Sequence, residues 1–187
     1  MDFFARPADV VAPELLGAVF TWNGVSIRLT EVEAYLGEDD PASHASRGLT
    51  RANAALFGPP GLMYVYHSYG IHKAGNIVCH PPGGSGGVLL RAGEVVAGQE
   101  LAASRRGPVP THKLASGPGN LGKALGLRIE DNSQPVQLVL PKTEVPFVRG
   151  PRIGITKNAQ APLRFWILGE KSVSARKRPR AGFGNGN

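Results

Sequence analysis

The chain has 187 residues, a length that fits one domain with its own hydrophobic core. Its single cysteine, Cys79, excludes a disulfide framework and any cysteine-rich metal site, and it fits a reducing cytosol. The formal net charge of +7 permits an anionic partner, but removing the four cations of the C-terminal tail leaves only +3. No apolar run could span a bilayer and residues 1–4 lack the pattern of a secretory signal, so we expect a cytoplasmic protein without a membrane partner.

The N-terminal part of the chain predicts a helix and a β-hairpin. Residues 9–16 are typical of a short helix that is closed by Gly17. Asn23-Gly24 is the strongest short signal for a two-residue hairpin turn, here between strands at 18–22 and 25–35.

The rest of the chain predicts a mixed fold. A polar connection rich in Gly and Pro covers residues 37–60, with a helical piece at 51–56, and connections of this length are usually functional or disordered. The later elements are strands at 63–66, 75–79, 88–91, 136–140, 152–156 and 163–168, and helices at 95–106 and 121–127. We therefore expect a single α+β domain over residues 1–175, built around a curved, mostly antiparallel sheet with peripheral helices. We expect residues 176–187 to form a basic, disordered tail.

The strand at 25–35 changes its hydrophobic face halfway along. Odd positions from 25 to 29 are apolar, but the same face then carries Glu31 and Glu33, while even positions from 32 to 36 become apolar. Either a bulge or a twist exchanges the faces, or two carboxylates point into the expected core. A broken pattern inside an ordered element often marks a functional site, whereas the plainer alternative is a strand end with two solvated glutamates.

Two groups of side chains could carry chemistry. Tyr64, Tyr66 and Tyr69 fall within six residues, which suits an aromatic platform for a stacked base, although a core strand with hydrogen-bonded tyrosines gives the same pattern. The Glu31/Glu33 pair fits chemistry at a glycosidic bond, where one acid activates water, but such sites normally take their acids from different strands. The sequence has no phosphate-binding loop, dinucleotide-binding glycine motif, zinc-protease motif or serine elbow, so we expect no metal chemistry.

Seven short motifs follow one another along the chain. They are TEVEAYLG at 30–37, SHASRG at 43–48, PGLMYVYHSYG at 60–70, VLLRA at 88–92, SGPGNL at 116–121, RIGI at 152–155 and PLRF at 162–165. Taken together, they resemble the alkyladenine (3-methyladenine/hypoxanthine) DNA glycosylase family. The resemblance runs from Val10 to Ser174 and implies a single mixed α/β domain around a curved antiparallel sheet, without metal or cofactor.

The resemblance also implies catalytic roles. Glu33 is expected to be the general base that activates the attacking water, and Arg91 is expected to hold that water and orient Glu33. The backbone carbonyl of Ile153 is expected to make a third contact with the water. A phosphate contact is the simpler role for Lys73, so we expect no lyase activity.

A second set of roles concerns the base. Tyr35, His44 and Tyr66 resemble the pocket that stacks an extruded base. Asn76 resembles the residue that excludes the exocyclic amine of guanine, and Tyr69 resembles the wedge that fills the gap left in the duplex. A lone histidine in a loop is more often a surface residue, and only the resemblance favours a pocket role for His44.

We therefore expect a monofunctional DNA glycosylase that flips damaged purines out of duplex DNA and initiates base excision repair. The expected substrates are 3-methyladenine-type alkylated bases, hypoxanthine and etheno-adducts, released by a water that Glu33 activates. We expect a monomer whose partner is double-stranded DNA with damaged purines and which needs no nucleotide cofactor. Two alternatives stay open: a non-catalytic damaged-DNA binder on the same scaffold, and a sugar or nucleoside hydrolase that uses Glu31 and Glu33.

Overall fold

One curled antiparallel sheet forms the body of the protein. The structure is a computed structural model and describes residues 3–174. Its strands are β1 (Val19–Trp22), β2 (Val25–Tyr35), β3 (Met63–Ser68), β4 (His72–Val78), β5 (Gly87–Ala97), β6 (Ala115–Ser116), β7 (Gln137–Val139), β8 (Val148–Gly150) and β9 (Arg164–Trp166). The main order is β3-β4-β5-β2-β1-β7, with β6 paired to β5, β9 to β2 and β8 to β9. The predicted α+β fold with a curved, mostly antiparallel sheet is confirmed.

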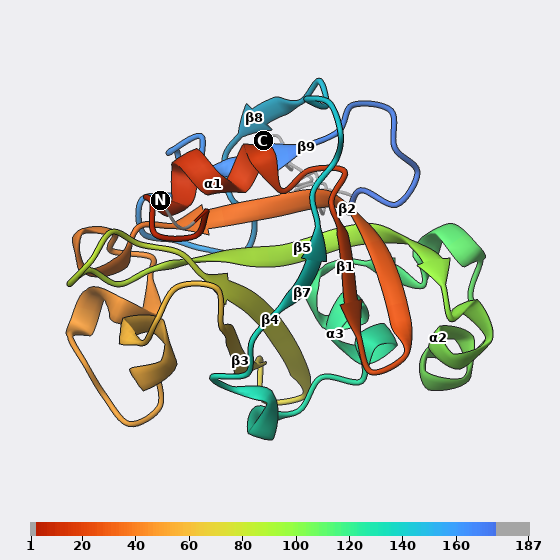
Figure 1. Cartoon of the computed structure of the whole chain (residues 1–187), viewed down its shortest axis with the longest axis horizontal. Helices are drawn as coiled ribbons and strands as arrows, with labels where there is room; N and C mark the ends of the chain where they lie inside the picture. The colour runs from red at the N-terminus through yellow and green to blue at the C-terminus, as the bar shows by residue number, and fades with distance from the viewer. Residues whose placement is uncertain (1–2, 175–187) are drawn as a thin grey trace, which may run out of the picture.

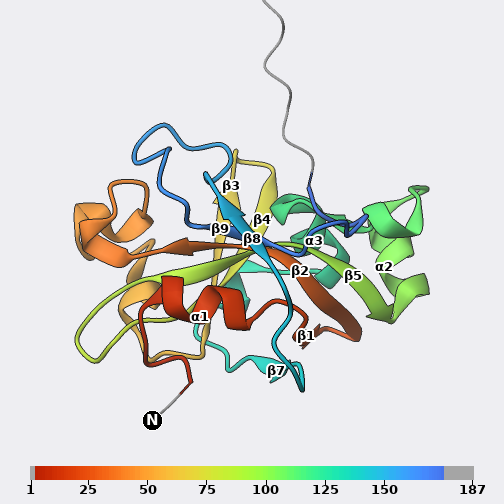
Figure 2. The same ribbon diagram turned by 90° about the horizontal axis from the view of Figure 1, so that it is seen from above.

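Helices pack against the inner strands of this sheet. Helix α1 (Ala8–Glu14) packs on β2 and β5, and α2 (Gln99–Arg106) packs on α3 (Pro118–Leu125), which in turn contacts β4 and β5. Figure 1 shows α1 above β2 and β5 and the α2–α3 pair below them, and Figure 2 also shows α1 apart from this pair. The predicted peripheral helices are therefore present in the described part of the chain.

The boundaries of all three helices described differ from the sequence prediction, and the helix predicted at 9–16 spans Ala8–Glu14. The helix predicted at 95–106 begins only at Gln99, because β5 continues through Ala97. The helix predicted at 121–127 begins earlier, at Pro118, whose fixed φ and missing N–H suit the first helical turn.

Strand β2 is central, and its hydrophobic face changes at a bulge. Its register against β5 shifts between Leu29 and Glu31 and again between Glu31 and Val32. Strand β9 pairs with the opposite edge of β2 from Glu31 to Glu33. Both glutamates are therefore enclosed, with 0% of each residue exposed. The exchange of faces by a bulge is confirmed, and the alternative of two solvated glutamates at a strand end is wrong.

Two hydrophobic clusters hold the elements together. The larger one packs α1 and α3 against the sheet, and its fully buried members include Val11, Leu15, Phe20, Ile27, Leu29, Val32, Leu90 and Leu121. The smaller one consists of Ala45, Leu56, Tyr64 and Val78. The smaller cluster joins the long connection after β2 to strands β3 and β4, and so fixes the position of that connection.

A buried ion pair also ties the long connection to the sheet. The connection contains the 3-10 turns η1 (Gly37–Asp39), η2 (His44–Arg47) and η3 (Ala54–Phe57). Asp40 accepts hydrogen bonds from both terminal nitrogens of Arg152, one of them 2.8 Å long, and both side chains are 0% exposed. Arg152 also donates to the backbone carbonyl of Ala34 in β2. The strand predicted at 152–156 is therefore wrong, because this irregular segment turns its arginine inward to the pair.

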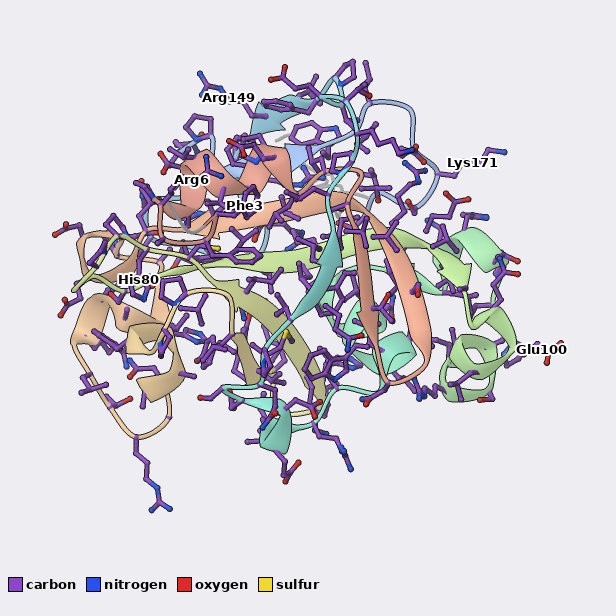
Figure 3. The ribbon with its side chains drawn as sticks, viewed as in Figure 1. Phe3, Arg6, His80, Glu100, Arg149 and Lys171 are labelled. Carbon is purple, nitrogen blue, oxygen red and sulfur yellow. The ribbon has the colours of Figure 1, made fainter. Side chains whose placement is uncertain are left out.

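Some cations of the described part lie on its surface. Figure 3 shows Arg149 of β8 and Lys171 pointing away from the fold, and both residues are exposed. The basic tail predicted at 176–187 lies outside the described residues. Within residues 3–174, no helix is long and apolar enough to cross a membrane.

Asp40→Asn should lower the free energy of unfolding by about 3–5 kcal/mol near neutral pH, because it leaves the buried Arg152 without its counter-charge. Burial opposes ionisation of Asp40, yet hydrogen bonds from Arg152 and Asn158 overcome it and hold the carboxyl pKa below its ordinary value. Such a group stabilises the fold above its unfolded-state pKa and ceases to do so as the pH falls through its folded-state pKa. Urea denaturation should therefore show the gap between wild type and variant narrowing below about pH 4.

Glu94→Gln is the matched control for this experiment. Glu94 pairs with Arg28 at 2.8 Å, but 54% of its side chain is exposed. Exposed pairs contribute about 0–1 kcal/mol. A loss for Asp40→Asn no larger than that of Glu94→Gln would show that the buried pair does not stabilise the connection.

Candidate active site

A cavity of about 840 Å³ opens between the long connection, the β3–β4 hairpin and the loop after β8. Its lining contains seven of the eight residues that the sequence indicates as site residues, namely Tyr35, His44, Tyr66, Tyr69, Asn76, Arg91 and Ile153. The eighth, Glu33, is fully buried and contacts three of the lining residues. The fold thus gathers residues that span more than half of the chain. Within residues 3–174, no group of three or more His, Cys, Asp or Glu side chains could hold a metal ion.

Glu33 is held by three neighbours. Its Oε1 accepts a 2.7 Å hydrogen bond from the backbone N–H of Ile153 and lies 3.3 Å from Nη1 of Arg91. Its Oε2 accepts a 3.0 Å hydrogen bond from the hydroxyl of Tyr35. Burial raises the pKa of Glu33 above its ordinary value, although the charge of Arg91 and the two hydrogen bonds act in the opposite direction. The carboxylate is therefore a stronger proton acceptor than a solvated glutamate.

Glu31 is saturated with hydrogen-bond donors. Its Oε1 accepts from Nε of Arg91 at 3.1 Å, from Nε of Arg164 at 2.6 Å and from the hydroxyl of Ser174 at 2.9 Å. Its Oε2 accepts from the backbone N–H of Ser174 at 2.6 Å. Glu31 is not part of the cavity lining. Its environment suits a carboxylate that holds its neighbours in place.

An aromatic wall faces the cavity. The rings of Tyr64 and Tyr66 stack with centroids 5.7 Å apart, and the His44 ring meets Tyr66 edge-on at 4.4 Å. Nδ1 of His44 is hydrogen-bonded to the hydroxyl of Tyr64 at 2.8 Å. Burial and the charge of Arg47 lower the pKa of His44, so its ring is neutral near physiological pH. Burial and nearby Glu33 raise the pKa of Tyr66 to about 12, so this wall carries no charge at neutral pH.

Tyr35 connects the cavity to the buried ion pair. The guanidinium carbon of Arg152 lies 4.5 Å from the centroid of the Tyr35 ring, a cation–π contact. Burial and the charge of Glu33 raise the pKa of Tyr35, so the hydroxyl keeps its proton and donates it to the Glu33 hydrogen bond. One side chain thus lines the cavity and orients the carboxylate behind it.

Two further predicted residues occupy the β3–β4 hairpin. Asn76 is 5% exposed and its Nδ2 donates to the backbone carbonyl of Tyr64, its partner in the ladder. Tyr69 lies in the turn with φ of 51°, and 83% of it is exposed. The turn therefore projects one tyrosine at the rim of the cavity, while Asn76 lies in its wall.

Sequence reasoning missed several contributors. Arg152 and Arg164 belong to two of the motifs that carry the resemblance, and an arginine among mostly apolar residues was a usable signal. Tyr64 belonged to the predicted tyrosine group but not to the predicted base pocket. Ser174 carried no signal at all. For Ile153, the resemblance implied a water contact through the backbone carbonyl. In the structure, Ile153 contacts Glu33 through its backbone N–H.

Comparisons with known proteins identify the family. The family model described as methylpurine-DNA glycosylase matches residues 2–171. A protein of Corynebacterium efficiens is 61% identical over 183 residues, which cover 95% of this chain and 96% of the relative. A protein of Corynebacterium glutamicum is 59% identical (93% and 95% covered), and one of Cutibacterium acnes is 50% identical (91% and 96% covered). All three are named as candidate 3-methyladenine DNA glycosylases. The chain therefore belongs to the methylpurine-DNA glycosylase family and is a DNA N-glycosylase of DNA repair.

Proposed function

We propose that this glycosylase releases alkylated purines, hypoxanthine and etheno-adducts from duplex DNA by the attack of a water that Glu33 activates. The observation that supports this most is the environment of Glu33. It is a buried carboxylate behind an aromatic cavity, with its proton affinity raised and an arginine 3.3 Å away. General bases are tuned in this way, by burial and by a fixed neighbouring charge.

The substrate base has to leave the duplex to reach Glu33. The glycosidic bond of a stacked nucleotide is inaccessible, and flipping the nucleotide costs a few kcal/mol. We propose that Tyr69 offsets part of this cost by entering the space that the base leaves, since an inserted side chain replaces lost stacking. Its exposure at the tip of the hairpin, beside the cavity, supports this role.

The proposed reaction is hydrolysis at the sugar carbon. Water attacks C1′, the bond between C1′ and the base nitrogen breaks with its electron pair going to the base, and Glu33 accepts a proton from the water. Arg91 orients Glu33 and helps to hold the water, and the carbonyl of Ile153 is proposed as a further water contact. No covalent intermediate with the protein is required, so no lyase step is proposed.

The pocket suits a cationic leaving base. N-alkylated purines carry a positive charge and leave as neutral molecules, so they need little acid assistance. We propose that Tyr35, His44 and Tyr66 stack the base, because electron-rich rings attract a cation. The lowered pKa of His44 supports this, since a protonated ring would repel a cationic base. Neutral hypoxanthine needs in addition a proton or a hydrogen bond at the leaving base.

The hydrogen bonds of Glu31 argue against the alternative of a hydrolase that acts on free sugars or nucleosides. Such an enzyme would need both carboxylates at the substrate, whereas both oxygens of Glu31 are occupied by donors. The alternative of a non-catalytic damaged-DNA binder is disfavoured, because the family is one of enzymes. We propose a monomer with one glycosylase domain over residues 1–175, whose basic residues at 176–187 add affinity for DNA phosphates without selecting the lesion.

Glu33→Gln should slow single-turnover excision by about 10²–10⁴-fold, because the amide keeps the shape but cannot accept a proton from water. The loss should appear with both cationic and neutral lesions, since both need the same nucleophile. Affinity for the damaged duplex should be retained. Duplexes that each carry one lesion, assayed for abasic sites, measure the rate, and near-wild-type rates would overturn the mechanism.

Glu31→Gln is the comparison for this variant. It should lower the melting temperature, because it removes the carboxylate charge paired with Arg164 and one of the two paired with Arg91. Per folded molecule it should retain more excision activity than Glu33→Gln. A larger loss of rate at Glu31 would show that the catalytic carboxylate is Glu31.

Tyr69→Ser should weaken binding to a damaged duplex and slow excision from it, yet spare excision from an unpaired single strand. Only a stacked base needs a wedge to hold the gap open. The single-stranded substrate serves as the control within the same experiment. Equal losses on the two substrates would contradict a wedge role for Tyr69.

Asn76→Ser should raise the release of undamaged guanine relative to hypoxanthine. The Asn76 side chain fills space in the cavity wall, where the exocyclic amine of guanine would clash and remain unpaired. Asn120→Ser is the matched control, since Asn120 also donates to a backbone carbonyl but does not line the cavity. An unchanged ratio for Asn76→Ser would make Asn76 a structural residue of β4.

A further inference from the structure

The end of the described chain is fastened onto β2. Residues 172–174, here called the C-terminal clamp, meet a strand that lies more than 140 positions earlier in the sequence. The hydroxyl of Ser172 is hydrogen-bonded to that of Thr30 at 2.8 Å, and Ser174 donates to Glu31 through both its N–H and its hydroxyl. Ser174 itself lines the cavity.

The Ser174 hydroxyl also contacts the arginine of the site. It donates to Oε1 of Glu31 at 2.9 Å and accepts from Nη2 of Arg91 at 3.3 Å. The guanidinium of Arg91 is thereby held at three points, by Ser174 at Nη2, by Glu31 at Nε and by Glu33 at Nη1. Arg164 is held by the same two residues, because it donates hydrogen bonds to Glu31 and to the carbonyl oxygen of Ser174.

We propose that Ser174 is a positioning residue for base excision, whose hydroxyl holds Arg91 in the orientation that places Nη1 against Glu33. The proposal rests on the catalytic roles proposed above for Glu33 and Arg91. Ser174 acts on the carboxylate through the arginine, since its own hydrogen bonds go to Arg91, Arg164 and Glu31. Without the hydroxyl, Nη2 of Arg91 loses its acceptor on this side, and only the contacts with Glu31 and Glu33 hold the guanidinium beside the open cavity.

The chain provides a matched control in Ser172. Its hydroxyl lies in the same clamp and is 3% exposed, but its hydrogen bond goes to Thr30 and not to Glu31 or Arg91. Ser172→Ala and Ser174→Ala therefore remove one hydroxyl hydrogen-bond group each from the same segment. A clamp that only stabilises the fold would respond alike to both changes.

The test measures single-turnover excision of a cationic methylated purine from a duplex as a function of pH, in the full chain. Ser174→Ala should lower the rate by about tenfold, the effect of one hydrogen bond to a charged group, while Ser172→Ala stays near wild type. The charged and titratable groups around Glu33 are Arg91, Glu31, Tyr35 and Tyr66. Since Arg91 lowers the pKa of Glu33, its displacement should move the acidic limb of the Ser174→Ala profile to higher pH.

Two outcomes would overturn the proposal. Equal rates and equal acidic limbs for the two serine variants would show that Ser174 stabilises the fold and does not position Arg91. A slower Ser174→Ala enzyme with an unmoved limb would mean that Arg91 keeps its place beside Glu33. Glu33→Gln is measured in parallel to separate these outcomes from a failure of the proposed function. An active Glu33→Gln enzyme would show that Glu33 is not the general base, on which the role of Ser174 depends.

Discussion

The cost of burying two carboxylates next to each other on one strand determines much of this structure. An ionised group inside a protein needs opposite charge and hydrogen bonds, or it takes up a proton instead. The bulge in β2 directs Glu31 and Glu33 inward, and β5, β9 and the C-terminal clamp supply their partners. Segments that are far apart in the sequence therefore meet at Glu31 and Glu33, because the two buried carboxylates need positive charges and hydrogen-bond donors.

The two carboxylates differ in how completely they are satisfied. Glu31 accepts hydrogen bonds from two arginines and from two donors of Ser174, so both of its oxygens are already occupied. Glu33 has one arginine at 3.3 Å and two neutral donors, and burial still raises its pKa. Glu31 binds Arg91, and Arg91 in turn contacts Glu33. This difference supports the proposal that Glu33 alone activates the water, rather than both carboxylates acting as a symmetrical acid pair.

The features that could be predicted from the sequence are those that depend on local residue patterns. The Asn23-Gly24 hairpin, the change of face in β2 and the antiparallel α+β fold followed from turn chemistry and from alternation of side chains. The strand predicted at 152–156 failed, because an extended apolar pattern cannot show that Arg152 turns inward to Asp40. The contact of Ser174 with Glu31 was beyond prediction, since no local pattern records a partner so distant in the chain.

The proposed mechanism requires that Glu33, a buried carboxylate of raised pKa, be ionised for excision. It is tested most directly by the pH dependence of single-turnover excision of a cationic methylated purine by the wild-type protein, because that base needs no acid to leave. We expect a single acidic limb with an apparent pKa above that of an ordinary glutamate, followed by a plateau. A rate that does not change with pH across this limb, or a limb below the ordinary glutamate range, would contradict it.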